Sequence, residues 1–274
     1  MYFPTRFLTA FLLALGLAVP APAQDGSEEI PFAGGTITIV ETTDYEKIVN
    51  FNGEEIDRDF QVWFERIATV RGTEVALISI GPGGNACGAN TLLLWSDGKD
   101  GVNTDKLPGD CGWPAPAVSD YAVFFVPWPG PGEELPVQRW APDEGFALAG
   151  MLRFVPEPDT GWAGITADPA IHPLEYFSNA AFFADAAAAL GDDLAEYALG
   201  LRVAAEMGKI DGDIYAATGC VPHNCGGADS LLVVDIAAET AWFAQKRGTQ
   251  IAQWPSADKW TPAARNALKQ LGTP

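Results

Sequence analysis

The order of apolar and polar positions divides the chain into two halves of different character. In the first half, short apolar runs alternate with polar residues or stand between Gly/Pro turns, which is typical of antiparallel strands. The strands we predict there are residues 36–40, 61–70, 74–80, 91–95, 121–128 and 146–154. Several short strands joined by such turns predict an antiparallel β-rich domain, either a sandwich or an open barrel.

The second half predicts helices around a small antiparallel sheet. Gly191 separates two Ala- and Leu-rich stretches, and Gly208 is the predicted stop of the second. Thr261 followed by Pro262 is typical of the start of a last helix. The predicted helices are 179–190, 194–207 and 261–271, and the predicted strands are 213–218, 231–236 and 240–245. The fold class is therefore α+β overall.

The N-terminus predicts export. Arg6 precedes an apolar run at 7–19, and a small-residue site ends at Ala23, so residues 1–23 are typical of a secretory signal peptide. The run is shorter than the span of about 20 residues that crosses a bilayer, and a retained N-terminal anchor is the alternative. No later run is long and apolar enough to span a membrane. The predicted location is periplasmic or secreted.

A change of composition predicts two domains. Residues 156–173 are rich in Pro, Gly and Asp, which is typical of a linker. It would separate a β-rich domain at 24–155 from a second domain at 174–274.

The charge is strongly acidic, with a formal net charge of −20. Residues 1–174 carry 24 Asp/Glu against 9 Lys/Arg, and residues 175–274 carry 12 against 7. This charge argues against nucleic acid as a partner.

Four cysteines in an exported chain predict two disulfides, for which three pairings exist. Sequence locality favours Cys87–Cys111 and Cys220–Cys225. A zinc site at Cys220, His223 and Cys225 is the competing interpretation, but no fourth ligand stands nearby. We therefore predict no metal and no cofactor.

The segment Cys220-Val221-Pro222-His223-Asn224-Cys225 is the most informative stretch of the sequence. A disulfide between its ends would close a very short ring with an imidazole at its tip. Pro222 fixes one backbone angle, so the ring would lose little freedom on binding. A stabilised hairpin that merely exposes His223 is the alternative interpretation.

This segment resembles the loop of the Ivy family, the inhibitors of vertebrate lysozyme, which carry Cys-Lys-Pro-His-Asp-Cys between two strands. Both cysteines, the proline and the histidine match in spacing. The resemblance covers the C-terminal domain and implies inhibition without catalysis, with a C-type lysozyme or related glycosidase as partner. It implies a target-binding loop of Val221, Pro222, His223 and Asn224, in which His223 lies between the target's two catalytic carboxylates.

Two positions depart from the family pattern. The family's lysine is Val221 in this chain, and its aspartate is Asn224. Val221 removes a cation that would favour an acidic cleft, and Asn224 retains hydrogen bonding without the charge. The loop architecture is compatible with both changes, while potency and choice of target depend on them.

The other sequence patterns give little support for catalysis or metal binding. The chain has only two histidines, one of them His172 in the linker, and it has no Gly-x-Ser-x-Gly motif, so we predict no enzyme. Residues 97–105 resemble a calcium loop, but Lys99 occupies a ligand position.

Two rival functions remain open. One is a non-inhibitory cell-envelope binding or structural protein, and the other is a carbohydrate hydrolase that uses Asp/Glu pairs.

Overall fold

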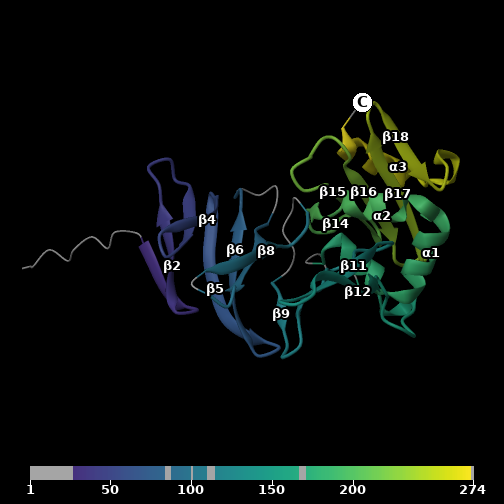
Figure 1. The fold of residues 1–274 in the computed structure, drawn as a ribbon. Helices are drawn as coiled ribbons and strands as arrows, with labels where there is room; N and C mark the ends of the chain where they lie inside the picture. Colours follow the sequence, from purple (N-terminus) through teal and green to yellow (C-terminus); the bar gives the residue numbers. More distant parts are fainter. Residues whose placement is uncertain (1–26, 84–87, 100, 110–114, 167–170, 273–274) are drawn as a thin grey trace, which may run out of the picture.

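The computed structural model describes residues 27–83, 88–99, 101–109, 115–166 and 171–272. Antiparallel sheets dominate the first part of the chain, and a sheet flanked by helices forms the second part (Figure 1). The predicted α+β class is confirmed. The predicted signal peptide and the pair Cys87–Cys111 lie outside the described residues.

The described residues of the N-terminal domain form three four-stranded sheets, each built from four consecutive strands. The first holds β1 Ser27–Phe32, β2 Gly35–Glu41, β3 Lys47–Phe51 and β4 Glu54–Asp59. The second holds β5 Gln61–Val70, β6 Thr73–Gly81, β7 Asn90–Ser96 and β8 Val102–Lys106. The third holds β9 Ala117–Val118, β10 Val123–Phe125, β11 Glu134–Ala141 and β12 Gly145–Arg153.

The central strands of the second sheet, β6 and β7, are buried on both faces. Ala76 and Ile78 of β6 belong to the core shared with the first sheet, whereas Val75 and Leu77 belong to the core shared with the third. Successive side chains of a strand point to opposite faces, so an unbroken apolar run is what a doubly covered strand requires. Burying each such Val, Leu or Ile side chain contributes about 1.5–3 kcal/mol. This sheet lies between the other two and contributes to both cores.

Some N-terminal strands carry no apolar signal. β4 has the sequence Glu-Glu-Ile-Asp-Arg-Asp, and it pairs with β3 through its backbone while Ile56 alone packs against the core.

The strand predicted at 121–128 is shorter in the structure, since β10 ends at Phe125. Residues 126–133 form a connection to β11, called the Trp128 loop below.

The C-terminal domain contains a six-stranded antiparallel sheet in the order β13-β15-β16-β17-β18, with β14 also paired to β15. Its three longest strands confirm the predicted ones, with small differences at their ends. The strands are β13 Val203–Ala204, β14 Gly208–Asp211, β15 Ile214–Cys220, β16 Ser230–Asp235, β17 Thr240–Arg247 and β18 Gln250–Trp254.

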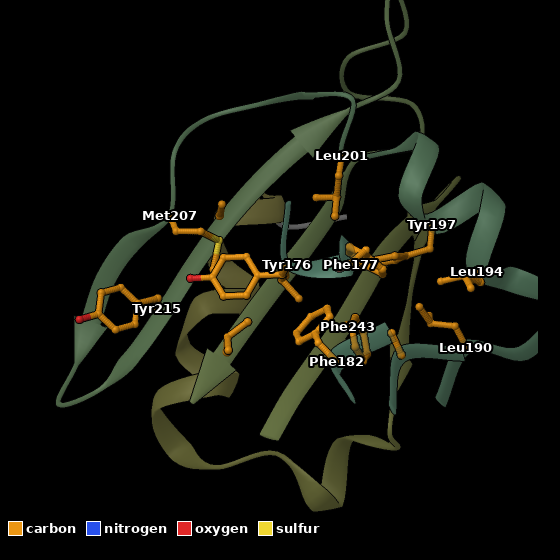
Figure 2. Packing of buried hydrophobic residues seen from close by; sticks show 14 of the residues in the cluster. Tyr176, Phe177, Phe182, Leu190, Leu194, Tyr197, Leu201, Met207, Tyr215 and Phe243 are labelled. Carbon is orange, nitrogen blue, oxygen red and sulfur yellow. The ribbon is translucent and has the colours of Figure 1, made fainter. Parts of the chain in front are cut away.

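Helices cover both faces of this sheet. On one face lie the 3-10 helix η2 Pro173–Ser178, α1 Ala180–Leu190 and α2 Leu194–Leu199, and on the other lie α3 Pro262–Ala267 and η5 Leu268–Leu271. Figure 2 shows the first face, where Phe182 and Tyr197 from the helices meet Phe243 of β17. Their ring centroids lie 6.2 and 5.4 Å from that of Phe243. No helix in the described part of the chain is long and apolar enough to span a membrane.

The cap of the last helix is as predicted, but the second helix is shorter than predicted. Thr261 Oγ1 accepts a hydrogen bond from the backbone N–H of Ala264 at 3.2 Å. The helix predicted at 194–207 is wrong beyond Leu199, because the following residues form β13 and pair with β15. Gly208 begins β14 and does not end a helix.

The described part of the predicted linker packs against the C-terminal domain. Trp162 is buried in the core of that domain, and its indole N–H donates to Asp185 Oδ2 at 2.8 Å. The Thr160 hydroxyl accepts from the backbone N–H of Ala180 at 2.7 Å, the first residue of α1. The C-terminal core therefore includes side chains that lie ahead of the boundary predicted at residue 174, and the boundary itself stays a prediction.

The first prediction concerns this boundary. A fragment of residues 156–274 should unfold cooperatively, and a fragment of residues 174–274 should be less stable by about 3 kcal/mol because it lacks Trp162, in line with tryptophan truncations in protein cores. Denaturant titration followed by circular dichroism measures both. The full-length variant Trp162→Ala is the control for the missing side chain alone. Equal stability of the two fragments would contradict the prediction.

Candidate functional site

The predicted ring is closed in the structure. Cys220 is the last residue of β15, and it forms a disulfide with Cys225, with the two Cα atoms 4.9 Å apart. The predicted pairing Cys220–Cys225 is confirmed. β16 begins five residues after Cys225, so the loop lies at the end of a hairpin between two central strands.

Two successive tight turns shape the loop. The backbone N–H of Asn224 donates to the carbonyl of Val221 at 3.0 Å, with Pro222 and His223 between them. The N–H of Gly227 then donates to the carbonyl of Asn224 at 3.1 Å. His223 has a φ of +64°, so Pro222 and His223 occupy the central positions of a turn that needs a left-handed residue in its second half.

His223 is an exposed residue at the tip of this first turn, while Val221 and Pro222 are half-buried. Histidine is among the residues that enter the left-handed region more readily than β-branched residues do. The turn thus presents the imidazole to solvent on a backbone held by a proline, a hydrogen bond and a disulfide.

The side chain of Asn224 lies against the second turn. A Cβ atom at Gly227 would lie 2.5 Å from Asn224 Oδ1 and 2.9 Å from its Cγ, so a side chain at position 227 would displace the Asn224 amide. The backbone of the loop continues through Gly226, whose φ is +91°. Asn224 therefore packs on its own loop in addition to being exposed.

A buried polar network fixes the base of the loop. The Ser230 side chain is fully buried and donates to the carbonyl of Tyr197 at 2.9 Å. The Tyr197 hydroxyl donates to the carbonyl of Leu231 at 2.8 Å. Burial raises the pKa of Tyr197 well above its usual value, so the phenol stays neutral and acts as the donor.

Close backbone approaches fix the same region. A Cβ atom at Gly200 would overlap the Ser230 hydroxyl, and one at Gly219 would lie 2.8 Å from the Cα of Leu201. The chain leaving α2 therefore runs directly against both strands that carry the loop. Val203 and Ala204 then pair with Cys220 and Gly219, which adds a strand beside the first cysteine.

Asp229 joins the loop to the next hairpin. Its Oδ1 accepts from the N–H of Gly226 at 2.7 Å, and its carbonyl accepts from the N–H of Lys246 at 2.8 Å. Asp229 thus fixes the C-terminal end of the loop, and the pairing of β13 with β15 fixes its N-terminal end.

The other sequence candidates have structural partners. Asp97 Oδ1 accepts from the N–H groups of Lys99 and Gly101 at 2.7 and 3.2 Å, and Asp105 Oδ2 accepts from the Trp140 indole at 3.0 Å. His172 Nδ1 accepts from the N–H of Leu174 at 3.2 Å and so caps η2. Among the described residues no group of three or more His, Cys, Asp and Glu is placed to hold a metal ion.

Sequence reasoning missed the residues that support the loop. Tyr197 and Gly200 lie on what the sequence predicts to be one long helix, and Ser230 is an ordinary polar residue ahead of a strand. A signal for Gly200 was present, since glycine is unfavourable inside a helix and common just after its end.

Two family models match the chain. Residues 33–153 match the model described as Y4bG N-terminal domain, and residues 181–274 match that of the Inhibitor of vertebrate lysozyme (Ivy) family. The resemblance of the C-terminal domain to the Ivy family is thereby confirmed. The Uncharacterized protein y4bG of Sinorhizobium fredii (strain NBRC 101917 / NGR234) is 24% identical over 227 residues, which are 82% of this chain and 83% of that protein.

The second prediction concerns the base of the loop. Tyr197→Phe should lower the free energy of unfolding by about 1–2 kcal/mol, because it removes the hydrogen bond to the buried carbonyl of Leu231. Tyr121→Phe is the matched control, since the Tyr121 side chain is 75% exposed and its substitution should stay within about 0.5 kcal/mol. Urea denaturation of both variants provides the measurement. A Tyr197→Phe protein as stable as the wild type would contradict the role of this network.

Proposed function

We propose that this protein is a secreted inhibitor or binder of C-type lysozyme-like glycosidases, and that the Cys220–Cys225 loop enters the target's substrate cleft. The observation that carries the proposal is the match of residues 181–274 to the Ivy family, together with the exposed His223 at the tip of a disulfide-closed loop. Ivy family members are inhibitors and not enzymes, which fits a binding role for this loop.

The chemistry of the target explains why an imidazole would block it. Retaining and inverting glycosidases hold two carboxyl groups about 5–9.5 Å apart, one of them protonated. A neutral imidazole can donate to one carboxylate and accept from a protonated carboxyl, and an imidazolium can donate to two carboxylates. In our proposal His223 occupies the place of the scissile bond between these groups, and Pro222 stiffens its approach.

The rigidity of the loop supports tight binding. Two turns, a disulfide and a buried network already fix the backbone in the free protein. Little conformational entropy would then be lost when the loop enters a cleft, so more of the contact energy would contribute to affinity. The proposal includes no cofactor and no metal.

The proposed location follows from the family and the N-terminus. Ivy family members are periplasmic or secreted, and residues 1–23 have the pattern of a signal peptide. We place cleavage near Ala23. Such a compartment allows the disulfide to persist.

The third prediction concerns His223. His223→Ala should weaken binding to a vertebrate C-type lysozyme by about 2 kcal/mol or more, as expected for an interface hot spot. The same change should lower the free energy of unfolding by no more than about 1 kcal/mol, because the side chain is exposed and only the preference of histidine over alanine for a positive φ is lost. Isothermal titration calorimetry and melting curves measure the two effects.

His223→Asn is the matched control for backbone strain. Asparagine tolerates a positive φ at least as well as histidine, so this variant keeps the turn while losing the imidazole. It should be as stable as the wild type and bind as weakly as His223→Ala. Wild-type affinity in either variant would remove His223 from the mechanism.

The fourth prediction concerns Val221, where the family carries a lysine. Val221→Lys should strengthen binding by about fivefold at low salt, because a surface cation near acidic groups gains on the order of 1 kcal/mol. The gain should decrease as salt screens the interaction. Val221→Met controls for side-chain length without charge, and it should not reproduce the salt-dependent gain. A Lys variant that binds no better than the Met variant would show that position 221 does not face the acidic cleft.

A further inference from the structure

A second rigid loop comes from the N-terminal domain. Trp128 in the Trp128 loop is 82% exposed, more than any other large apolar side chain in the described part of the chain. Prolines at 127, 129 and 131 fix every second φ angle of the loop, which limits its freedom before binding. Tryptophan is the residue type most enriched among binding hot spots, so a tryptophan held out on a stiff loop has the properties of a contact residue.

An ion pair ties this loop to the C-terminal domain. Glu133 accepts a hydrogen bond from the N–H of Gly130 at 2.6 Å, which closes the loop on itself. Both carboxylate oxygens of Glu133 accept from Arg202 Nη2, at 2.8 and 2.7 Å. The Glu133 side chain is 18% exposed and that of Arg202 is 39% exposed, so the pair is partly shielded from solvent on the side of Glu133.

Backbone packing adds a second tie. A Cβ atom at Gly132 would lie 2.9 Å from the backbone nitrogen of Ala195 and from Leu194 Cγ. The Trp128 loop thus lies directly on the first turn of α2.

The same short segment holds the Cys220–Cys225 loop. Arg202 contacts the Trp128 loop, and the next residue, Val203, pairs with Cys220. This chain of contacts limits the distance between the Cα atoms of Trp128 and Cys220 to about 30 Å. A standard protein interface of about 800 Å² per partner has about that width. Val203, 52% exposed, lies between the two loops along this path.

We propose that the Trp128 loop is a second contact element for the partner of the Cys220–Cys225 loop, so that both domains bind one glycosidase molecule. This inference rests on the proposed function. The acidic first half of the chain, with 24 Asp/Glu against 9 Lys/Arg in residues 1–174, favours a cationic partner on this side. The alignment with the y4bG protein spans 227 residues, which is longer than either family match alone. The two domains therefore occur together in that protein also.

The test uses the full-length mature protein and a vertebrate C-type lysozyme in isothermal titration calorimetry. Trp128→Ala should lower the affinity at least tenfold while leaving the melting temperature unchanged. Tyr121→Ala is the matched control, because Tyr121 is a 75% exposed aromatic residue at the opposite end of β10 and should retain wild-type affinity. In an Arg202→Ala background, which releases the loop, Trp128→Ala should have a smaller effect than in the wild type.

The outcomes separate this inference from the proposed function. Loss of affinity in His223→Ala with full affinity in Trp128→Ala would overturn the inference and retain the function. Absence of binding by the wild type would overturn both. The Trp128 loop could instead bind a second copy of this chain, and sedimentation of the wild type and Trp128→Ala tests this. If the wild type is a dimer, and Trp128→Ala is a monomer with unchanged affinity for lysozyme, the inference is overturned.

Discussion

The close approach of the chain after α2 to the base of the hairpin is the constraint on which the loop depends. Gly200 and Gly219 leave no room for a side chain, so the backbone after the helix runs directly against the strands that carry Cys220 and Ser230. The contact buries Ser230 and Tyr197, whose hydrogen bonds then replace those they would make with water. A disulfide alone would close the ring, but these contacts orient the ring relative to the sheet.

Local patterns predicted a large part of the fold. Unbroken apolar runs marked the strands that are covered on both faces, such as β6 and β7, and the Thr261-Pro262 pair marked the start of α3. The spacing of cysteines, proline and histidine identified the loop. What the sequence left out depends on backbone pairing that needs no apolar side chains, or on long-range contacts. β4 pairs through its backbone despite its charges, α2 ends where Gly200 meets Ser230, 30 positions further along the chain, and Glu133 binds Arg202 across 69 positions.

The two loops are both ordered before binding, but different interactions fix their backbones. The Cys220–Cys225 loop is held by a covalent bond and two turns, and the Trp128 loop is held by alternate prolines and the Glu133–Arg202 pair. Each presents an exposed aromatic side chain, His223 or Trp128, on a backbone that is already ordered. Because the segment from Gly200 to Ala204 contacts both, a change in this segment would alter the two loops together, although it contributes no exposed ring itself.

The arrangement of the N-terminal sheets has a consequence for how the chain acquires its structure. Each of the three sheets is made of four consecutive strands, so all of its strand pairing joins neighbours in the sequence. Contacts between sequence neighbours close small loops and form quickly, whereas pairing of distant strands is slow. As the chain is synthesised, each sheet can pair as soon as its own four strands have emerged, and the later step is the stacking of preformed layers on the second sheet. Such an order limits the time during which unpaired strand edges are open to other chains.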